Sequence, residues 1–78
     1  MKIKTLKTKH GNVTRCVFVT DDSGNRYCFS YDQLVASIID GRYEEYVGDM
    51  YYSQTSRRHK AAFKREFGNE IVCDLTRF

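Results

Sequence analysis

The sequence predicts a small α+β domain in which one amphipathic helix packs on an antiparallel sheet of about four to six strands. Two observations predict this class. The N-terminal half of the chain alternates apolar and polar residues with period two, and the stretch over about residues 53–67 has the composition and end signals of a helix. The 78 residues form a single domain, 1–78, since a chain of this length has no room for a second core.

The N-terminal third predicts two strands, at about residues 2–9 and 13–20, with β-branched and aromatic residues at alternate positions. His10, Gly11 and Asn12 supply the turn between them, because glycine or asparagine can take the positive φ that a tight hairpin needs. The first strand is rich in lysine, which is typical of a sheet edge where charge discourages pairing with other chains.

A third strand is predicted at about residues 25–31. Asp21 and Asp22 precede it in a Ser-Gly turn. We interpret them as solvated loop residues rather than calcium ligands, because the alternating oxygen ligands of a calcium loop are missing. Three aromatic residues fall on one side of this strand: Tyr27, Phe29 and Tyr31.

The segment from Ser30 to Gly41 is ambiguous. Its apolar residues have the spacing of a helix face. However, Leu34–Ile39 is also a short apolar run that ends at Asp40 and Gly41, the chemistry of a two-residue hairpin turn into a further strand at about residues 42–47. The residue pattern alone leaves strand and helix equally open.

The helix at about residues 53–67 has Ser53 as its N-cap, and Gly68 with Asn69 predicts a left-handed stop at its C-terminus. We expect Thr55 and His59, one turn apart on the inner face, to share a hydrogen bond. The tail at residues 71–75 can supply a last short strand at a sheet edge. A narrow stripe of residues should face the sheet: Thr55, His59, Ala62, Phe63 and Phe67.

Composition excludes several classes. Apolar residues make up 41% of the chain, which is too many for a disordered protein. There is no apolar run of the roughly 18 residues that would cross a bilayer, so we expect a cytoplasmic protein. Cys16, Cys28 and Cys73 are odd in number and lack a C-x-x-C spacing, which favours reduced thiols over a disulfide framework or a zinc site. We therefore expect no metal and no cofactor.

Two stretches of the chain together resemble a family of small uncharacterised proteins from phages and other bacterial mobile elements. They are SYDQLVA (Ser30–Ala36) and YYSQTSRRHKAAF (Tyr51–Phe63), against the recurring pattern S-Y-x-T-x-V-A and then Y-S-x-T-T-x-K-H-x-x-x-F. Gln33, Ser56 and Arg58 depart from it conservatively. The matching residues are Ser30, Tyr31, Val35, Ala36, Tyr52, Ser53, Thr55, His59 and Phe63.

The resemblance implies that Leu34–Ile39 is a strand. It also implies an accessory protein of a phage or mobile element, working in the host bacterial cytoplasm, in a class that includes anti-defence inhibitors such as anti-CRISPR proteins. It brings no catalytic residue with it. From the residues themselves we expect no enzymatic activity, because His59 lacks a nucleophile and an orienting acid at a spacing that would bring them together.

Two surfaces are candidates for binding. Residues 1–19 hold five basic and no acidic side chains, residues 20–49 two basic and seven acidic, and residues 50–78 six basic and three acidic. We expect a host protein or nucleoprotein complex to be the partner, bound by an acidic, tyrosine-bearing segment: Tyr43, Glu44, Glu45, Tyr46 and Asp49. The alternative is nucleic acid bound by the basic helix face: Arg57, Arg58, Lys60, Lys64 and Arg65. An exposed strand edge also leaves homodimerisation open.

Overall fold

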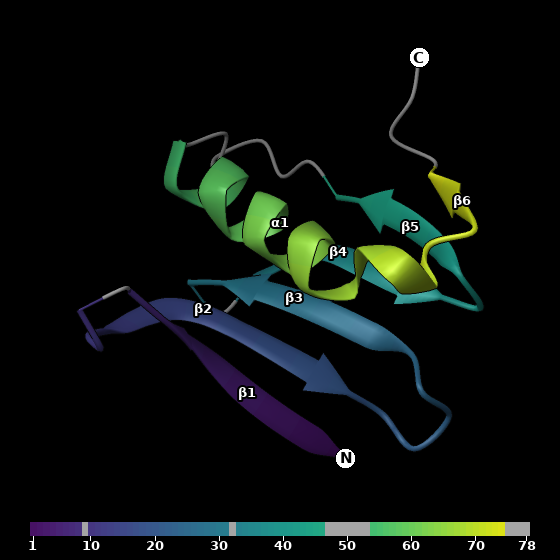
Figure 1. The fold of residues 1–78 in the computed structure, drawn as a ribbon, viewed down its shortest axis with the longest axis horizontal. Helices are drawn as coiled ribbons and strands as arrows, with labels where there is room; N and C mark the ends of the chain where they lie inside the picture. The colour runs from purple at the N-terminus through teal and green to yellow at the C-terminus, as the bar shows by residue number, and fades with distance from the viewer. Residues whose placement is uncertain (9, 32, 47–53, 75–78) are drawn as a thin grey trace.

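The computed structural model describes residues 1–8, 10–31, 33–46 and 54–74. They form an α+β domain with a six-stranded sheet and one α-helix (Figure 1). The elements in chain order are β1 (Lys2–Lys7), β2 (Val13–Thr20), β3 (Arg26–Ser30), β4 (Gln33–Ile39), β5 (Arg42–Glu45), α1 (Gln54–Phe67), the short 3-10 helix η1 (Gly68–Glu70) and β6 (Cys73–Asp74).

The strands lie in the sheet in the order in which they follow one another along the chain. The four pairings from β1 to β5 are antiparallel, whereas β5 and β6 are parallel, with Arg42 opposite Cys73. The sheet is therefore mixed, and the expectation of a purely antiparallel sheet was wrong for its last strand. The parallel pairing follows from α1, which carries the chain back across the sheet before β6 begins. The lysine-rich β1 forms one edge of the sheet, as predicted.

The ambiguous segment is a strand, β4, as the family resemblance implied. A bulge explains its misleading pattern. Cys28 lies opposite Ala36 and the next residue, Phe29, lies opposite Leu34, so that Val35 is an extra residue in β4. Val35 and Ala36 are consequently both buried. Ser37, in contact with Tyr46 on the opposite face, and Ile38 are buried too, so that four consecutive buried residues break the period of two.

Asp40 and Gly41 form the two-residue turn between β4 and β5, as predicted. Their φ angles of 53° and 79° are those of a type I′ turn. Gly41 is needed for a second reason, which is the close approach of Val72 to its backbone. Its carbonyl oxygen accepts hydrogen bonds from the backbone N–H groups of Val72 (2.7 Å) and Cys73 (3.1 Å), and a Cβ at this position would lie 2.9 Å from Cγ2 of Val72.

The end of α1 differs from the expectation. Gly68 does not adopt a positive φ, and the chain continues into η1, which closes with a hydrogen bond from the backbone N–H of Ile71 to the oxygen of Gly68 (3.1 Å). The expected N-cap, Ser53, lies outside the described residues. Within the described part of the chain, no helix is both long and apolar enough to cross a membrane.

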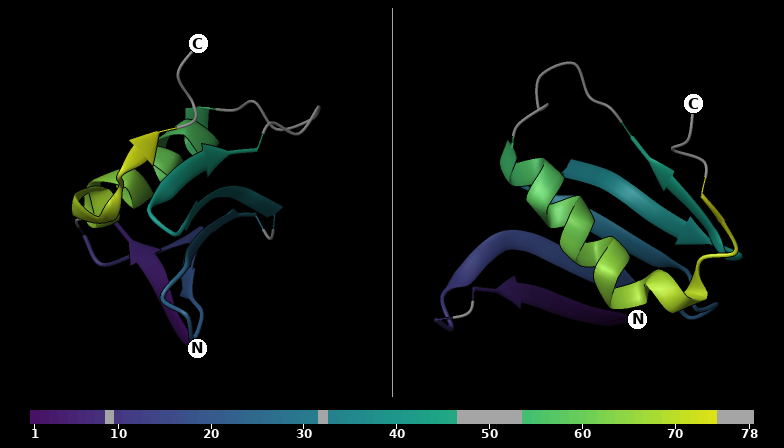
Figure 2. Two further views of the ribbon diagram at one scale, coloured as in Figure 1. Left: turned by 90° about the vertical axis from the view of Figure 1, so that its right-hand side faces the viewer. Right: turned by 45° about the horizontal axis from the view of Figure 1, so that its top comes forward.

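The core lies between α1 and one face of the sheet, and Figure 2 shows the helix on that face. Phe63 is fully buried at its centre. Its ring centroid lies 5.3 Å from that of Phe18, 5.5 Å from Phe67 and 6.2 Å from Tyr43. We call this face the helix side of the sheet and the opposite one the far side.

Candidate functional site

The basic residues of α1 do not form one cationic face, because the two flanks of the helix differ. On the flank towards β5 and β6, Nζ of Lys60 lies 3.3 Å from Oε1 of Glu45, and Lys64 forms an ion pair with Asp74. Nζ of Lys64 also lies 4.9 Å from the ring centroid of Tyr43. Two of the five predicted cations are therefore neutralised by acids of the sheet, and Arg57 is exposed on this same flank.

The other flank of α1 faces β1 and β2. Helical periodicity places Arg58 and Arg65 on it, together with Ala62 and Glu66, and both arginines are exposed. Two hollows follow one another along the space between this flank and the two strands. We call the two together the groove.

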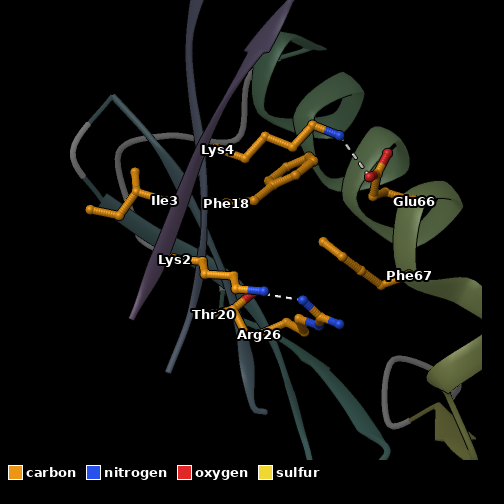
Figure 3. Close-up of a pocket in the computed structure, with 8 residues that line it drawn as sticks. All are labelled: Lys2, Ile3, Lys4, Phe18, Thr20, Arg26, Glu66 and Phe67. Carbon is orange, nitrogen blue, oxygen red and sulfur yellow. Dashed lines mark hydrogen bonds and ion pairs between the residues drawn. The ribbon is translucent and has the colours of Figure 1, made fainter. Parts of the chain in front are cut away.

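The first hollow has a volume of about 530 Å³ and lies beside the C-terminal turns of α1. Figure 3 shows Lys2 and Lys4 extending from β1 towards the helix, while Ile3 between them points away. Phe18 and Phe67 provide aromatic rings in it. The sequence showed that Lys2 and Lys4 lie on one side of β1, but it did not show that α1 would lie opposite them.

Two of the cations in the first hollow are held by carboxylates. Lys4 pairs with Glu66 at 2.7 Å. Arg26 lies 4.3 Å above the ring centroid of Phe67 and donates two hydrogen bonds to Glu70, at 3.1 and 2.8 Å. These contacts fix the guanidinium of Arg26 in place, since a two-pronged bond and a stacked ring both restrict its rotation.

The second hollow has a volume of about 450 Å³ and lies beside the N-terminal half of α1. Leu6 and Val13 give it apolar walls, and Tyr31 and His59 give it rings. Its remaining lining residues are Lys7, Thr8, Thr14, Arg15 and Arg58.

The groove has a strong excess of positive charge. Among the described residues that line the two hollows, six are lysine or arginine and one, Glu66, is acidic. Four of the six make no ion pair with any residue that the structure describes: Lys2, Lys7, Arg15 and Arg58. These four cations come from the β1–β2 hairpin and from α1, which are far apart in the sequence, so no single stretch of the chain revealed the charge of the groove.

The acidic, tyrosine-bearing segment does not form one surface. Tyr43 is fully buried on the helix side, and its hydroxyl donates to Glu45 at 2.7 Å. Glu44 is exposed, and Tyr46 reaches the Ser37 hydroxyl at 2.8 Å on the far side. Tyr43 is therefore a core residue, and Glu45 is occupied by Tyr43 and Lys60. The fifth member, Asp49, lies outside the described residues.

The two halves of the family-like pattern meet in the core. Nδ1 of His59 lies 2.8 Å from the hydroxyl of Ser30. The expected hydrogen bond between Thr55 and His59 stays a prediction, because the side chain of Thr55 lies outside the described part. Burial lowers the pKa of His59, which keeps its ring neutral at pH 7. Next to this pair, the sulfurs of Cys16 and Cys28 lie 3.9 Å apart, and the contact with Cys16, together with burial, raises the pKa of Cys28.

A serine next to a histidine can serve as a nucleophile with its base, but here both are inaccessible. The side chains of Ser30 and His59 belong to residues that are 2% and 6% exposed. The pair is best explained as a polar link that attaches α1 to β3 without an unsatisfied buried group. The absence of enzymatic activity stays a prediction. No cluster of potential metal ligands occurs among the described residues.

Comparison with known proteins gives one match. Neither the curated proteins nor the solved structures include a match to the chain. A family model described as "Family of unknown function (DUF8033)" matches residues 1–76, nearly the whole length. The protein therefore belongs to this family of unknown function.

Proposed function

We propose that the protein binds nucleic acid through the groove between α1 and the β1–β2 pair. The observation that supports this proposal is the distribution of charge on the two flanks of the helix. Acids of β5 and β6 neutralise Lys60 and Lys64, whereas the groove side keeps four cations without a described ion pair. Closely spaced cations of this kind neutralise successive phosphates and release their counterions.

Salt dependence tests the proposal. If the four groove cations without a described ion pair each neutralise one phosphate, the affinity should fall about 50-fold for a single strand and about 150-fold for a duplex between about 50 and 200 mM salt. Fluorescence anisotropy with a labelled oligonucleotide measures this. Arg58→Glu should weaken binding about tenfold or more and reduce the slope of log affinity against log salt by about one.

Arg42→Glu is the matched control, because Arg42 is exposed on β5, away from the groove, and the substitution changes the net charge by the same amount. It should leave the affinity nearly unchanged. Equal weakening by both variants, or no binding at low salt, would contradict the proposal.

A protein partner is the second candidate, and one observation favours it. The far side of the sheet, opposite α1, presents Ile3, which is 67% exposed, together with half-buried Val17, Val19 and Phe29. A host protein that docks there should be captured from nuclease-treated host lysate. Ile3→Lys should abolish its capture, while Arg58→Glu should not. Capture that depends on intact nucleic acid would favour the groove instead.

The biological setting is also a proposal. The resemblance to proteins of phages and mobile elements supports an accessory role in the cytoplasm of a bacterial host, including an anti-defence role of the anti-CRISPR kind. Location of the coding sequence within prophage or plasmid regions checks this setting. Coding sequences found only among conserved chromosomal genes would count against it.

A further inference from the structure

We propose that the groove takes a single strand, and that an unpaired base stacks on the ring of Tyr31 in the second hollow. This inference rests on the proposed nucleic-acid binding and names its substrate class. Tyr31 is 49% exposed at the mouth of a hollow whose other ring, that of His59, is buried. A half-exposed aromatic ring beside cations is the arrangement that proteins use for bases of single strands.

The backbone of Tyr31 is the first observation. Its φ is 53°, in the left-handed region, which is unusual for a bulky side chain and costs about 1–2 kcal/mol relative to the ordinary conformation. Glycine or asparagine would relieve this strain. The backbone N–H of Tyr31 donates to the oxygen of Arg15 at 3.0 Å, which holds the residue in place between β3 and β4. The presence of a large ring at a strained position points to a use for that ring.

The placement of the ring is the second observation. By strand alternation Tyr31 should lie on the far side with Tyr27 and Phe29. Instead its ring lies 6.0 Å from that of His59, which belongs to the helix side, at an interplanar angle of 35°. The left-handed turn therefore brings Tyr31 round the end of the sheet and into the second hollow.

The chemistry of the hollow fits one nucleotide of a strand. Leu6 and Val13 offer apolar surface to a base, and Lys7, Arg15 and Arg58 offer positive charge to its phosphates. None of the described lining residues is acidic. The first hollow continues along β1 with Lys2, so that neighbouring phosphates of the same strand have a cation to meet. Bases inside a duplex are already stacked and cannot reach Tyr31.

Three ligands distinguish stacking of a base from contacts with phosphates: a labelled oligothymidine of about twelve nucleotides, an abasic strand of the same length and charge, and a duplex. Loss of the Tyr31 ring is expected to weaken binding to the oligothymidine about 10- to 100-fold. The same loss should leave binding to the abasic strand and to the duplex within about twofold, because those depend on phosphate contacts. Thymidine monophosphate should not displace the strand at the same nucleotide concentration, since it meets only one hollow.

Tyr31→Gly is the informative variant, because glycine accepts the positive φ, and this relief of strain offsets the loss of the ring's contact with His59, so that the fold should stay intact. Tyr31→Phe is its control, since it keeps the ring and should bind as the natural protein does. If Tyr31→Gly loses equal affinity for the oligothymidine and the abasic strand, or loses none for either, the proposal that a base stacks on Tyr31 is wrong. Absence of binding to all three ligands by the natural protein would instead overturn the proposed function itself.

Discussion

Replacement of Phe63 by alanine is expected to remove about 3–5 kcal/mol from the free energy of unfolding. Phe63 is fully buried and packs against Phe18, Phe67 and Tyr43, so its truncation leaves a cavity where both layers of the domain meet. A chain of 78 residues is stable by about 4–12 kcal/mol at typical values per residue, so this loss is a large fraction of the total and should lower the melting temperature markedly. Denaturation with guanidinium chloride, followed by circular dichroism, measures the loss.

Val72→Ala provides the control for Phe63. Val72 is 87% exposed, and its truncation should change the unfolding free energy by less than about 0.5 kcal/mol. A loss below about 1 kcal/mol for Phe63→Ala would mean that the domain is not held together by contact between α1 and the sheet.

The double substitution Lys2→Glu with Arg58→Glu is expected to weaken nucleic-acid binding about 100- to 1,000-fold. Lys2 lies on β1 in the first hollow and Arg58 on α1 in the second, so the pair places two negative charges along the groove. Each unit of charge is worth about 1 kcal/mol at contact distance in water, and the double variant changes four units. Fluorescence anisotropy at low salt, with melting temperatures checked in parallel, measures the effect.

Arg42→Glu with Arg57→Glu changes the net charge equally but lies outside the groove, with Arg57 on the opposite flank of α1. This control double should retain most of the affinity. If it loses as much as the groove variant while the fold is intact, the binding surface is the outward helix face that the sequence first indicated, or the attraction is merely to overall charge.

The sequence was a good guide to the elements with a simple period. The first three strands, the Asp40–Gly41 turn and the helix were all predicted to within a few residues. The residue pattern left β4 undecided between strand and helix, because the extra residue Val35 interrupts the alternation by which strands are recognised. It also gave no sign that β6 would pair in parallel with β5.

The site was harder to predict than the fold, because contacts between segments that are distant in the sequence decide which cations are neutralised by an acid. On a helical wheel Lys60 and Lys64 lie on the outer face of the helix. Their acidic partners, Glu45 and Asp74, come close to them only because β5 and β6 lie beside α1 in the folded structure. The split of the tyrosine segment, by contrast, could have been inferred. A strand at residues 42–47 places Tyr43 on one face and Glu44 on the other.

The strand order has a consequence for how the chain folds. Each strand from β1 to β5 pairs with its neighbour in sequence, so this meander needs only short loops to close and can form early. The pairing of Arg42 with Cys73 instead spans about thirty residues and has to wait until α1 has docked. The groove, whose walls are β1 and α1, therefore exists only after this late docking step, although β1 is made first.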